Sequence, residues 1–145
     1  MKPSDIRELA RLLIEREQPL IGEYQRTLAN ARTLHSVVKA AREAFEEETR
    51  REGLDQLRLE LTEVESDAKN IRNVQFYLRR GRWAAVFVAM SANRFRLVGP
   101  FKTGGEEGPC EEGEMNAANR DALILDRIGE LIDQGFAVRP PKKSG

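Results

Sequence analysis

One seam of apolar residues, spread over residues 20–45, constrains the fold of this 145-residue chain more than any other feature. Its members alternate four and three residues apart, which places them along one side of a long helix. Only Thr27 among them is polar. Residues 3–5 offer an N-cap for a shorter helix that comes first, and we expect Pro19 to separate the two helices. The seam consists of Leu20, Tyr24, Thr27, Ala31, Leu34, Val38, Ala41 and Phe45.

A second seam with the same three-four spacing follows a turn at residues 51–53. It consists of Leu54, Leu57, Leu61, Val64, Ala68, Ile71, Gln75 and Leu78. Neither helix can bury its apolar stripe alone, so two such helices joined by a short turn are expected to lie antiparallel. The sequence therefore predicts a long, coiled-coil-like helical hairpin as a first domain over residues 1–80.

A small β-containing module is predicted to follow over residues 81–138. Gly81 weakens the helical pattern. The segments 83–90 and 94–101, with sequences WAAVFVAM and RFRLVGPF, flank residues 91–93 in a way that is typical of a β-hairpin. The alternative is a helix that continues through the alanines to about residue 90. With the hairpin and this module together, the predicted fold class is α+β.

The C-terminal third is expected to alternate between irregular and helical structure. Residues 103–116 are glycine-rich and acidic, which indicates a mobile surface loop. Asn116 or Asn119 caps a final helix that Gly135 stops. Residues 136–138 are expected to form a last short strand. The final segment, 139–145, is a basic tail.

Charge is segregated along the chain although the formal net charge is zero. Residues 68–105 carry 8 basic side chains and 0 acidic ones, whereas the segments before and after them are each net acidic. We call residues 69–102 the basic segment. A zero average argues against a strong nonspecific polyanion binder, but a local cluster can still face phosphate or an acidic protein.

The side chains that commonly carry chemistry are scarce. His35 is the single histidine, which excludes a histidine-based metal set or a Ser-His-Asp triad within one chain, and we interpret it as a flank residue of the hairpin interface. The single cysteine, Cys110, has acidic neighbours that disfavour a reactive thiolate. We therefore expect no catalytic residue, metal or cofactor. No apolar run is long enough to span a bilayer, so a soluble, cytoplasmic protein without membrane partners is expected.

Two groups of residues are candidates for binding a macromolecule. The first combines cations and a ring of the basic segment: Lys69, Arg72, Arg79, Arg80, Arg82, Trp83, Arg94 and Arg96. Interleaved aromatic and basic residues are typical of single-stranded nucleic-acid binding, but the same rings are needed for the core of the module. The second group is acidic and falls where the two predicted helices meet, at the tip of an arm roughly 45 Å long. It consists of Glu46, Glu47, Glu48, Glu52 and Asp55.

Two stretches resemble the GINS family of replication proteins. An Ile-Arg-x-Val segment followed by Tyr-Leu-Arg-x-x-Arg lies near the end of the predicted helical part, and the residues are Ile71, Arg72, Val74, Tyr77, Leu78, Arg79 and Arg82. Residues 99–102 look like the G-P-F turn of the small archaeal GINS domain, and residues 126–137 are similar to its closing helix and strand. The resemblance implies a non-enzymatic scaffold that assembles with related subunits and bridges the replicative helicase to its partners.

The leading hypothesis is thus a scaffold or adaptor that assembles with protein partners, as a homo- or hetero-oligomer, through its long helices. Long amphipathic helices in so short a chain bury their stripes best against other helices. One alternative is a coiled-coil arm that acts on RNA polymerase through the acidic tip, as in transcript-cleavage factors. The other is a nucleic-acid-binding module that uses the basic segment. The sequence does not identify the partner or the stoichiometry.

Overall fold

The computed structural model of the chain describes residues 1–70, 72–105 and 108–138. One helix, α1, spans Pro3–Arg51 and is followed by an antiparallel sheet and a second helix, α2, which spans Arg120–Phe136. The strands are β1 (Glu60–Leu61), β2 (Glu65–Ser66), β3 (Val74–Arg80), β4 (Trp83–Met90), β5 (Arg94–Lys102) and β6 (Cys110–Glu114). The predicted α+β class is confirmed.

The sheet is built from neighbouring strands joined by tight turns. Its order is β1-β3-β4-β5-β6, and β2 pairs with β3 beyond β1. Strands β4 and β5 form the hairpin predicted around residues 91–93, so residues 83–90 are a strand rather than a helix. The turn places Asn93 at φ 57°, a left-handed conformation that asparagine tolerates better than most residues. Strands β3 and β4 form a second hairpin through Gly81, also at φ 57°, so the boundary expected after residue 80 falls inside a hairpin.

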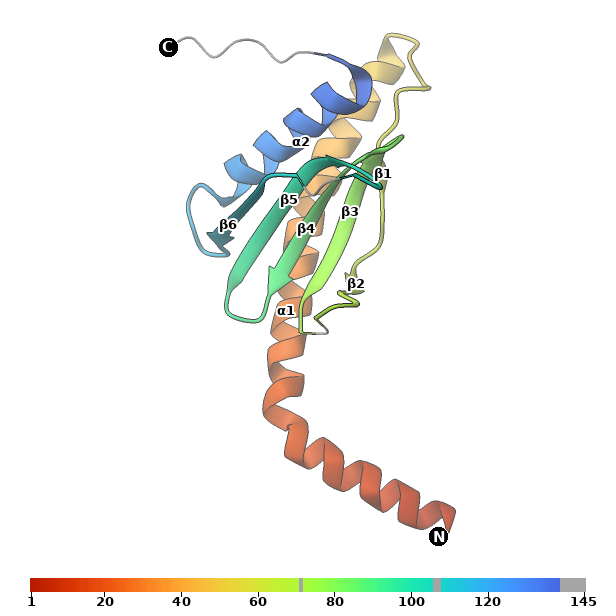
Figure 1. The fold of residues 1–145 in the computed structure, drawn as a ribbon, viewed down its shortest axis with the longest axis vertical. Coiled ribbons are helices and arrows are strands. Elements are labelled where there is room, and N and C mark those ends of the chain that lie inside the picture. Colours follow the sequence, from red (N-terminus) through yellow and green to blue (C-terminus); the bar gives the residue numbers. More distant parts are fainter. Residues whose placement is uncertain (71, 106–107, 139–145) are drawn as a thin grey trace.

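Both helices cover the same face of the sheet (Figure 1). Along β3, β4 and β5, alternate side chains point to the face that the helices cover. On this face the rings of Phe76 and Phe87 stack, with their centroids 5.2 Å apart. Helix α1 contributes Thr27, Ala31, Leu34 and Val38 to this core, and α2 contributes Ile124, Ile128 and Leu131. Among the described residues no helix covers the opposite face of the sheet, and we call it the open face.

The helical hairpin predicted over residues 1–80 is wrong, because its second helix is absent. Residues 54–70 and 72–73 form turns, irregular segments and two short strands, and residues 74–80 form β3. The three-four seam included Gln75, which lies toward the open face, and left out Phe76, which is fully buried. Val74, Phe76 and Leu78 are buried and alternate with more exposed residues, which is the pattern of a strand with one buried face. The pairing of these residues with β4 also favours the strand. The sheet thus buries the α1 stripe in place of a second helix.

Three smaller expectations also need correction. Helix α1 runs through Pro19 without ending, and the chain only bends there (Figure 1). The loop expected over residues 103–116 contains β6, whose Gly113 leaves room for the Phe95 ring where a Cβ would lie 2.5 Å from Cζ. The strand expected at residues 136–138 is the end of α2, with Ala137 in a left-handed C-cap. The tail, residues 139–145, lies outside the described residues.

Candidate functional site

The first half of α1 extends away from the rest of the molecule (Figure 1). We call residues 3–26 the arm, because Thr27 is the first buried residue of the helix. Its large apolar side chains remain about half exposed, for example Ile6 at 54%, Leu9 at 52% and Leu13 at 49%. The complete set of such residues in the arm is Ile6, Leu9, Leu12, Leu13, Ile14, Leu20 and Tyr24. So many large apolar side chains on one exposed segment mark an interaction surface.

The arm carries the same apolar stripe that α1 buries on the sheet. Ile6, Leu9 and Leu13 are three and four residues apart, and Leu20 and Tyr24 continue the line into the buried residues. Leu12 is displaced by roughly 120° from the line of Ile6, since each residue turns the helix by about 100°. The stripe is thus a continuous feature of α1, buried within the chain over its second half and unpartnered over its first half.

An apolar hollow lies where the arm leaves the body of the molecule. It has a volume of about 470 Å³ and is lined on the arm by Leu20, Ile21, Glu23 and Tyr24 and on the body by Ser66 of β2, Arg72 and Ser91. The hydroxyl groups of Tyr24 and Ser66 lie 3.4 Å apart across its wall. The apolar side of the hollow is thus the base of the exposed stripe, and the side that the body contributes is polar.

The structure separates the cations of the basic segment instead of gathering them. Arg94 and Arg96 lie on β5, and Arg96 donates two hydrogen bonds to Glu112 of β6, at 2.8 and 3.1 Å. The hydrogen bond from Arg96 lowers the pKa of Glu112 below its usual range, and the same bond raises the pKa of Arg96. Arg94 lies 3.5 Å from Glu112 and 3.9 Å from Glu114. Glu112 and Glu114 of β6 thus neutralise the charges of Arg94 and Arg96 in the basic segment.

The other members of the basic group lie on different surfaces. Arg79 lies over the Tyr77 ring on the open face, whereas Arg80 lies over Phe136 of α2 on the helix-covered face. Trp83 is half-buried and packs against the core. Lys69 and Arg72 are exposed on the β2–β3 connection, and Arg82 is exposed at the β3–β4 turn. The eight residues therefore do not form a single patch.

The acidic group lies at the body end of α1 rather than at the tip of a free arm. Phe45, next to it in the chain, packs against Phe136 with the ring centroids 5.5 Å apart. Glu46 pairs with Arg42 at 3.6 Å, and Glu47 and Glu48 pair with Arg51. Glu52 is the exposed C-cap residue of α1. The free end of the helix is its N-terminus, at the opposite end of the molecule.

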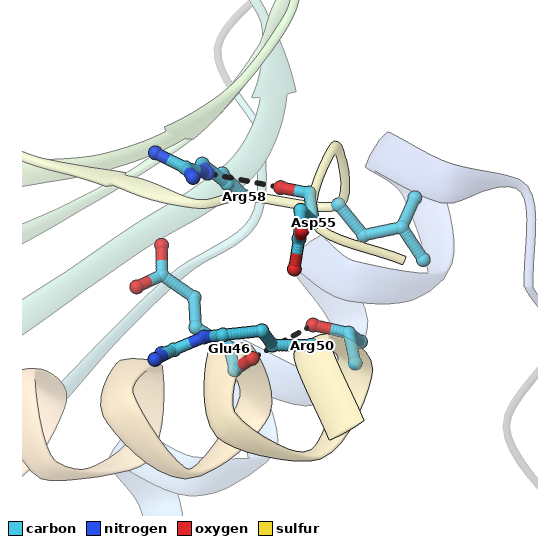
Figure 2. Close-up of a pocket in the computed structure, with 6 residues that line it drawn as sticks. Glu46, Arg50, Asp55 and Arg58 are labelled. Atoms are coloured by element: carbon cyan, nitrogen blue, oxygen red, sulfur yellow. Dashed lines mark hydrogen bonds between the residues drawn. The ribbon is translucent and has the colours of Figure 1, made fainter. Parts of the chain in front are cut away.

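A small hollow of about 280 Å³ lies beside this acidic group (Figure 2). Figure 2 shows Glu46 and Arg50 on the last turns of α1 and Asp55 and Arg58 on the segment that follows. The Arg58 Nε donates a hydrogen bond of 2.9 Å to the Asp55 carbonyl oxygen, which fixes this segment as a turn. The two carboxylates and two guanidinium groups leave the hollow with balanced charge.

His35 and Cys110 occupy structural positions. The His35 Nε2 lies 3.0 Å from the Thr62 carbonyl oxygen, and its ring meets Phe76 edge-on, with centroids 4.9 Å apart. Cys110 is exposed at the start of β6. Within residues 1–70, 72–105 and 108–138, no three His, Cys, Asp or Glu side chains are grouped to hold a metal ion. Over the same residues, no helix is long and apolar enough to cross a membrane.

The chain matches no protein-family model, no curated protein and no solved structure. The resemblance to GINS subunits therefore stays a prediction. The segment that carries its first motif, around Tyr77, Leu78 and Arg79, lies on β3 rather than at the end of a helix. The arm was missed as a candidate site by sequence reasoning, although the three-four spacing of Ile6, Leu9 and Leu13 was visible. The missing information was which half of the stripe the rest of the chain would cover.

Proposed function

We propose that this chain is an assembly protein whose arm pairs with the arm of a second copy. The observation that carries the proposal is the apolar stripe of α1, which is buried from Thr27 onward and left half-exposed before it. A long amphipathic helix gains most of its stability from packing its apolar face. A second arm supplies a face of the same length and pattern, so the pair buries both stripes at once.

The charge of the arm favours a second copy as the partner. The arm carries four basic and five acidic side chains, distributed along the whole segment. Two such arms do not repel each other, and their flanks offer both signs of charge to each other. A strongly acidic or strongly basic partner would gain nothing from this arm. The cyclic two-fold dimer is also the commonest arrangement of soluble homo-oligomers.

The hollow at the base of the arm supports an antiparallel pairing. The arm is roughly 36 Å long as a straight helix. In an antiparallel pair, the apolar N-terminal end of one arm, around Ile6, reaches the base of the other, where Leu20 and Tyr24 line the hollow. This arrangement covers the tip and the hollow together, and it keeps the two bodies at opposite ends of the paired helices.

Sedimentation equilibrium on the full-length chain, over a wide concentration range, tests the proposal. We expect a monomer–dimer equilibrium that the double substitution Leu9→Glu/Leu13→Glu shifts to monomer, because it places two charges in the apolar stripe of each arm. The control is Gln18→Glu, which adds a charge to an exposed residue of the same helix, roughly 180° from Leu9 and 140° from Leu13 around the helix. A second control, Leu125→Glu, adds a charge at an exposed leucine of α2.

Three outcomes would contradict the proposal. One is a wild-type chain that stays monomeric at all concentrations. Another is loss of association with Gln18→Glu or Leu125→Glu as readily as with the double variant. The third is a monomer that binds lipid vesicles through the arm, since an amphipathic helix with this pattern can also lie on a membrane surface. Far-UV circular dichroism of each variant verifies that the body remains folded.

The role in DNA replication implied by the GINS resemblance is a narrower form of this proposal. It requires assembly with related but different subunits, so a dimer of this chain alone in the native source would contradict it. The polymerase alternative requires the acidic group at the C-terminal end of α1 to contact the enzyme. A charge swap at Glu47 and Glu48 that leaves partner binding unchanged would contradict that alternative.

A further inference from the structure

A third hollow lies on the body, between the C-terminal half of α1 and the sheet edge at β1 and β3. Its volume is about 480 Å³. Four of the residues that line it are arginines from three separate segments: Arg42, Arg58, Arg79 and Arg80. Two carboxylates, Glu46 and Glu60, also line it, which leaves the lining with a net charge of about +2. We call it the arginine hollow.

The structure holds three of the four guanidinium groups of the hollow, those of Arg58, Arg79 and Arg80, by contacts other than a carboxylate. Arg58 is fixed through its Nε hydrogen bond to the Asp55 carbonyl oxygen. The guanidinium carbons of Arg79 and Arg80 each lie 4.8 Å from the centre of an aromatic ring. Such contacts position the side chain and leave its N–H groups available to a ligand.

The charges of the hollow are incompletely neutralised within the described part of the chain. Arg42 lies 3.6 Å from Glu46, yet its buried Nε donates no hydrogen bond among the described residues. None of the ion pairs among these residues involves Arg58, Arg79 or Arg80. Four arginines against two carboxylates leave the lining with a net positive charge, which an anion in the hollow would balance. Arginine is also the side chain best suited to bind phosphate oxygens in pairs.

A groove of mixed polar and apolar character, with Asp67, Lys69 and Gln75 among its lining residues, lies on the open face of the sheet, and the contact between Arg79 and Tyr77 links it to the arginine hollow. This groove has a volume of about 420 Å³ and contains Tyr77, the ring on which Arg79 lies. Phe101 of β5 lines it as well, together with Val86 and Val98, which pair with each other across β4 and β5. Aromatic rings on an open sheet face can stack on unpaired bases, whereas bases inside a duplex are not accessible to them.

We propose that the arginine hollow binds the phosphates of single-stranded nucleic acid, and that the adjoining bases lie across the open face against Tyr77 and Phe101. Charge complementarity selects the phosphate, and the shared position of Arg79 and Tyr77 connects the phosphate site to the ring. The site lies on the body and uses no arm residue. It therefore stands independently of the proposed pairing of arms.

Fluorescence anisotropy of a labelled twelve-nucleotide oligothymidylate, titrated with the full-length chain at several salt concentrations, tests this inference. With two to four phosphates neutralised, we expect log K to fall with log salt at a slope of about −1.4 to −2.8. The substitution Arg58→Ala/Arg79→Ala is expected to reduce the magnitude of the slope by about 1.4 and to weaken binding by about tenfold or more. Tyr77→Leu is expected to weaken binding by about tenfold without changing the slope, because it removes stacking and no charge.

The matched control removes the same charge from a different surface. Arg32→Ala/Lys39→Ala changes two exposed cations on the outer side of α1, and we expect less than about a twofold effect. The inference is overturned if this control weakens binding as much as Arg58→Ala/Arg79→Ala. It is also overturned if a duplex of the same length or a polyglutamate peptide binds as tightly as the single strand. Binding of inorganic phosphate without binding of the oligonucleotide overturns it as well.

Discussion

The two halves of α1 have the same amphipathic pattern and different surroundings. From Thr27 to Phe45 the stripe packs on the sheet, and Leu34 is completely buried. From Ile6 to Tyr24 the same stripe has no partner within the described chain, and its large side chains stay about half exposed. Helix geometry does not change between the halves except for the bend at Pro19.

This difference shows that a heptad stripe indicates which face of a helix must be buried. It does not indicate whether the same chain or another molecule covers that face. In the second half of α1 the partner is a β-sheet of the same chain, which buries the stripe without a coiled coil. In the first half it is left to another molecule. The body of the protein thus owes its stability to contacts within the chain, and the arm is expected to gain stability only by association.

The largest expected effect comes from truncating one leucine in each half. Leu34→Ala leaves a cavity in the core and is expected to lower the free energy of unfolding by about 2–5 kcal/mol. Leu13→Ala, the same change in the arm, is expected to alter it by less than about 0.5 kcal/mol in the monomer. Urea denaturation followed by Trp83 fluorescence, at concentrations below association, measures both. Equal losses for the two variants would mean that the arm packs on the body.

A local effect of about 3 kcal/mol is expected from Pro19→Ala. Proline lacks the backbone N–H that would complete the helical hydrogen bonding at the bend, and alanine restores it. Amide hydrogen exchange of residues 15–22 should become slower, while the urea midpoint of the body stays unchanged. Faster exchange at these residues, or a shift of the midpoint, would show that the bend supports packing between arm and body.

The smallest effect is expected from Glu112→Gln, on the β5–β6 edge of the body. Because the Arg96 hydrogen bond lowers the pKa of Glu112, the ionised carboxylate stabilises the fold above the ordinary glutamate pKa of 4.5. This contribution is lost as the pH falls below that value through the lowered pKa.

The thermal midpoints of wild type and variant should therefore differ at pH 7 and converge in acid. A difference that persists at pH 2 would argue against the ion pair as its source. The monomer–dimer constant at pH 7 should be the same for both chains, because Glu112 lies far from the arm stripe. A changed monomer–dimer constant would show that the β5–β6 edge influences association through the arm.

Local signals in the sequence were sufficient for part of the fold. The β4–β5 hairpin was predictable because apolar and β-branched residues flank a short polar turn, and α2 was predictable from its spaced apolar residues behind Asn119. The prediction of a second helix was wrong because apolar residues in the 54–78 region occur at both helical and strand spacing. Only the long-range pairing of β3 with β4 decides between the two, and no local pattern contains it.

The candidate sites were less predictable for the same reason. Arg96 and Glu112 are far apart in sequence and become partners through the β5–β6 pairing, which neutralises part of the basic segment. The arginine hollow joins Arg42 of α1 to Arg58 and to β3, and no sequence neighbourhood unites these residues. The stripe of the arm was readable from the sequence, but its exposure depends on how far the sheet extends along α1.

The continuity of α1 has a mechanical consequence. The segment that anchors the core and the segment that reaches outward are one rod, with a fixed bend and no flexible linker between them. In a dimer held by the two arms, the helices would fix both the distance between the two bodies and their relative orientation. Force applied to one body would pass through the helical backbone of the paired arms to the other body. A change in the position of one body would therefore change the position of the other.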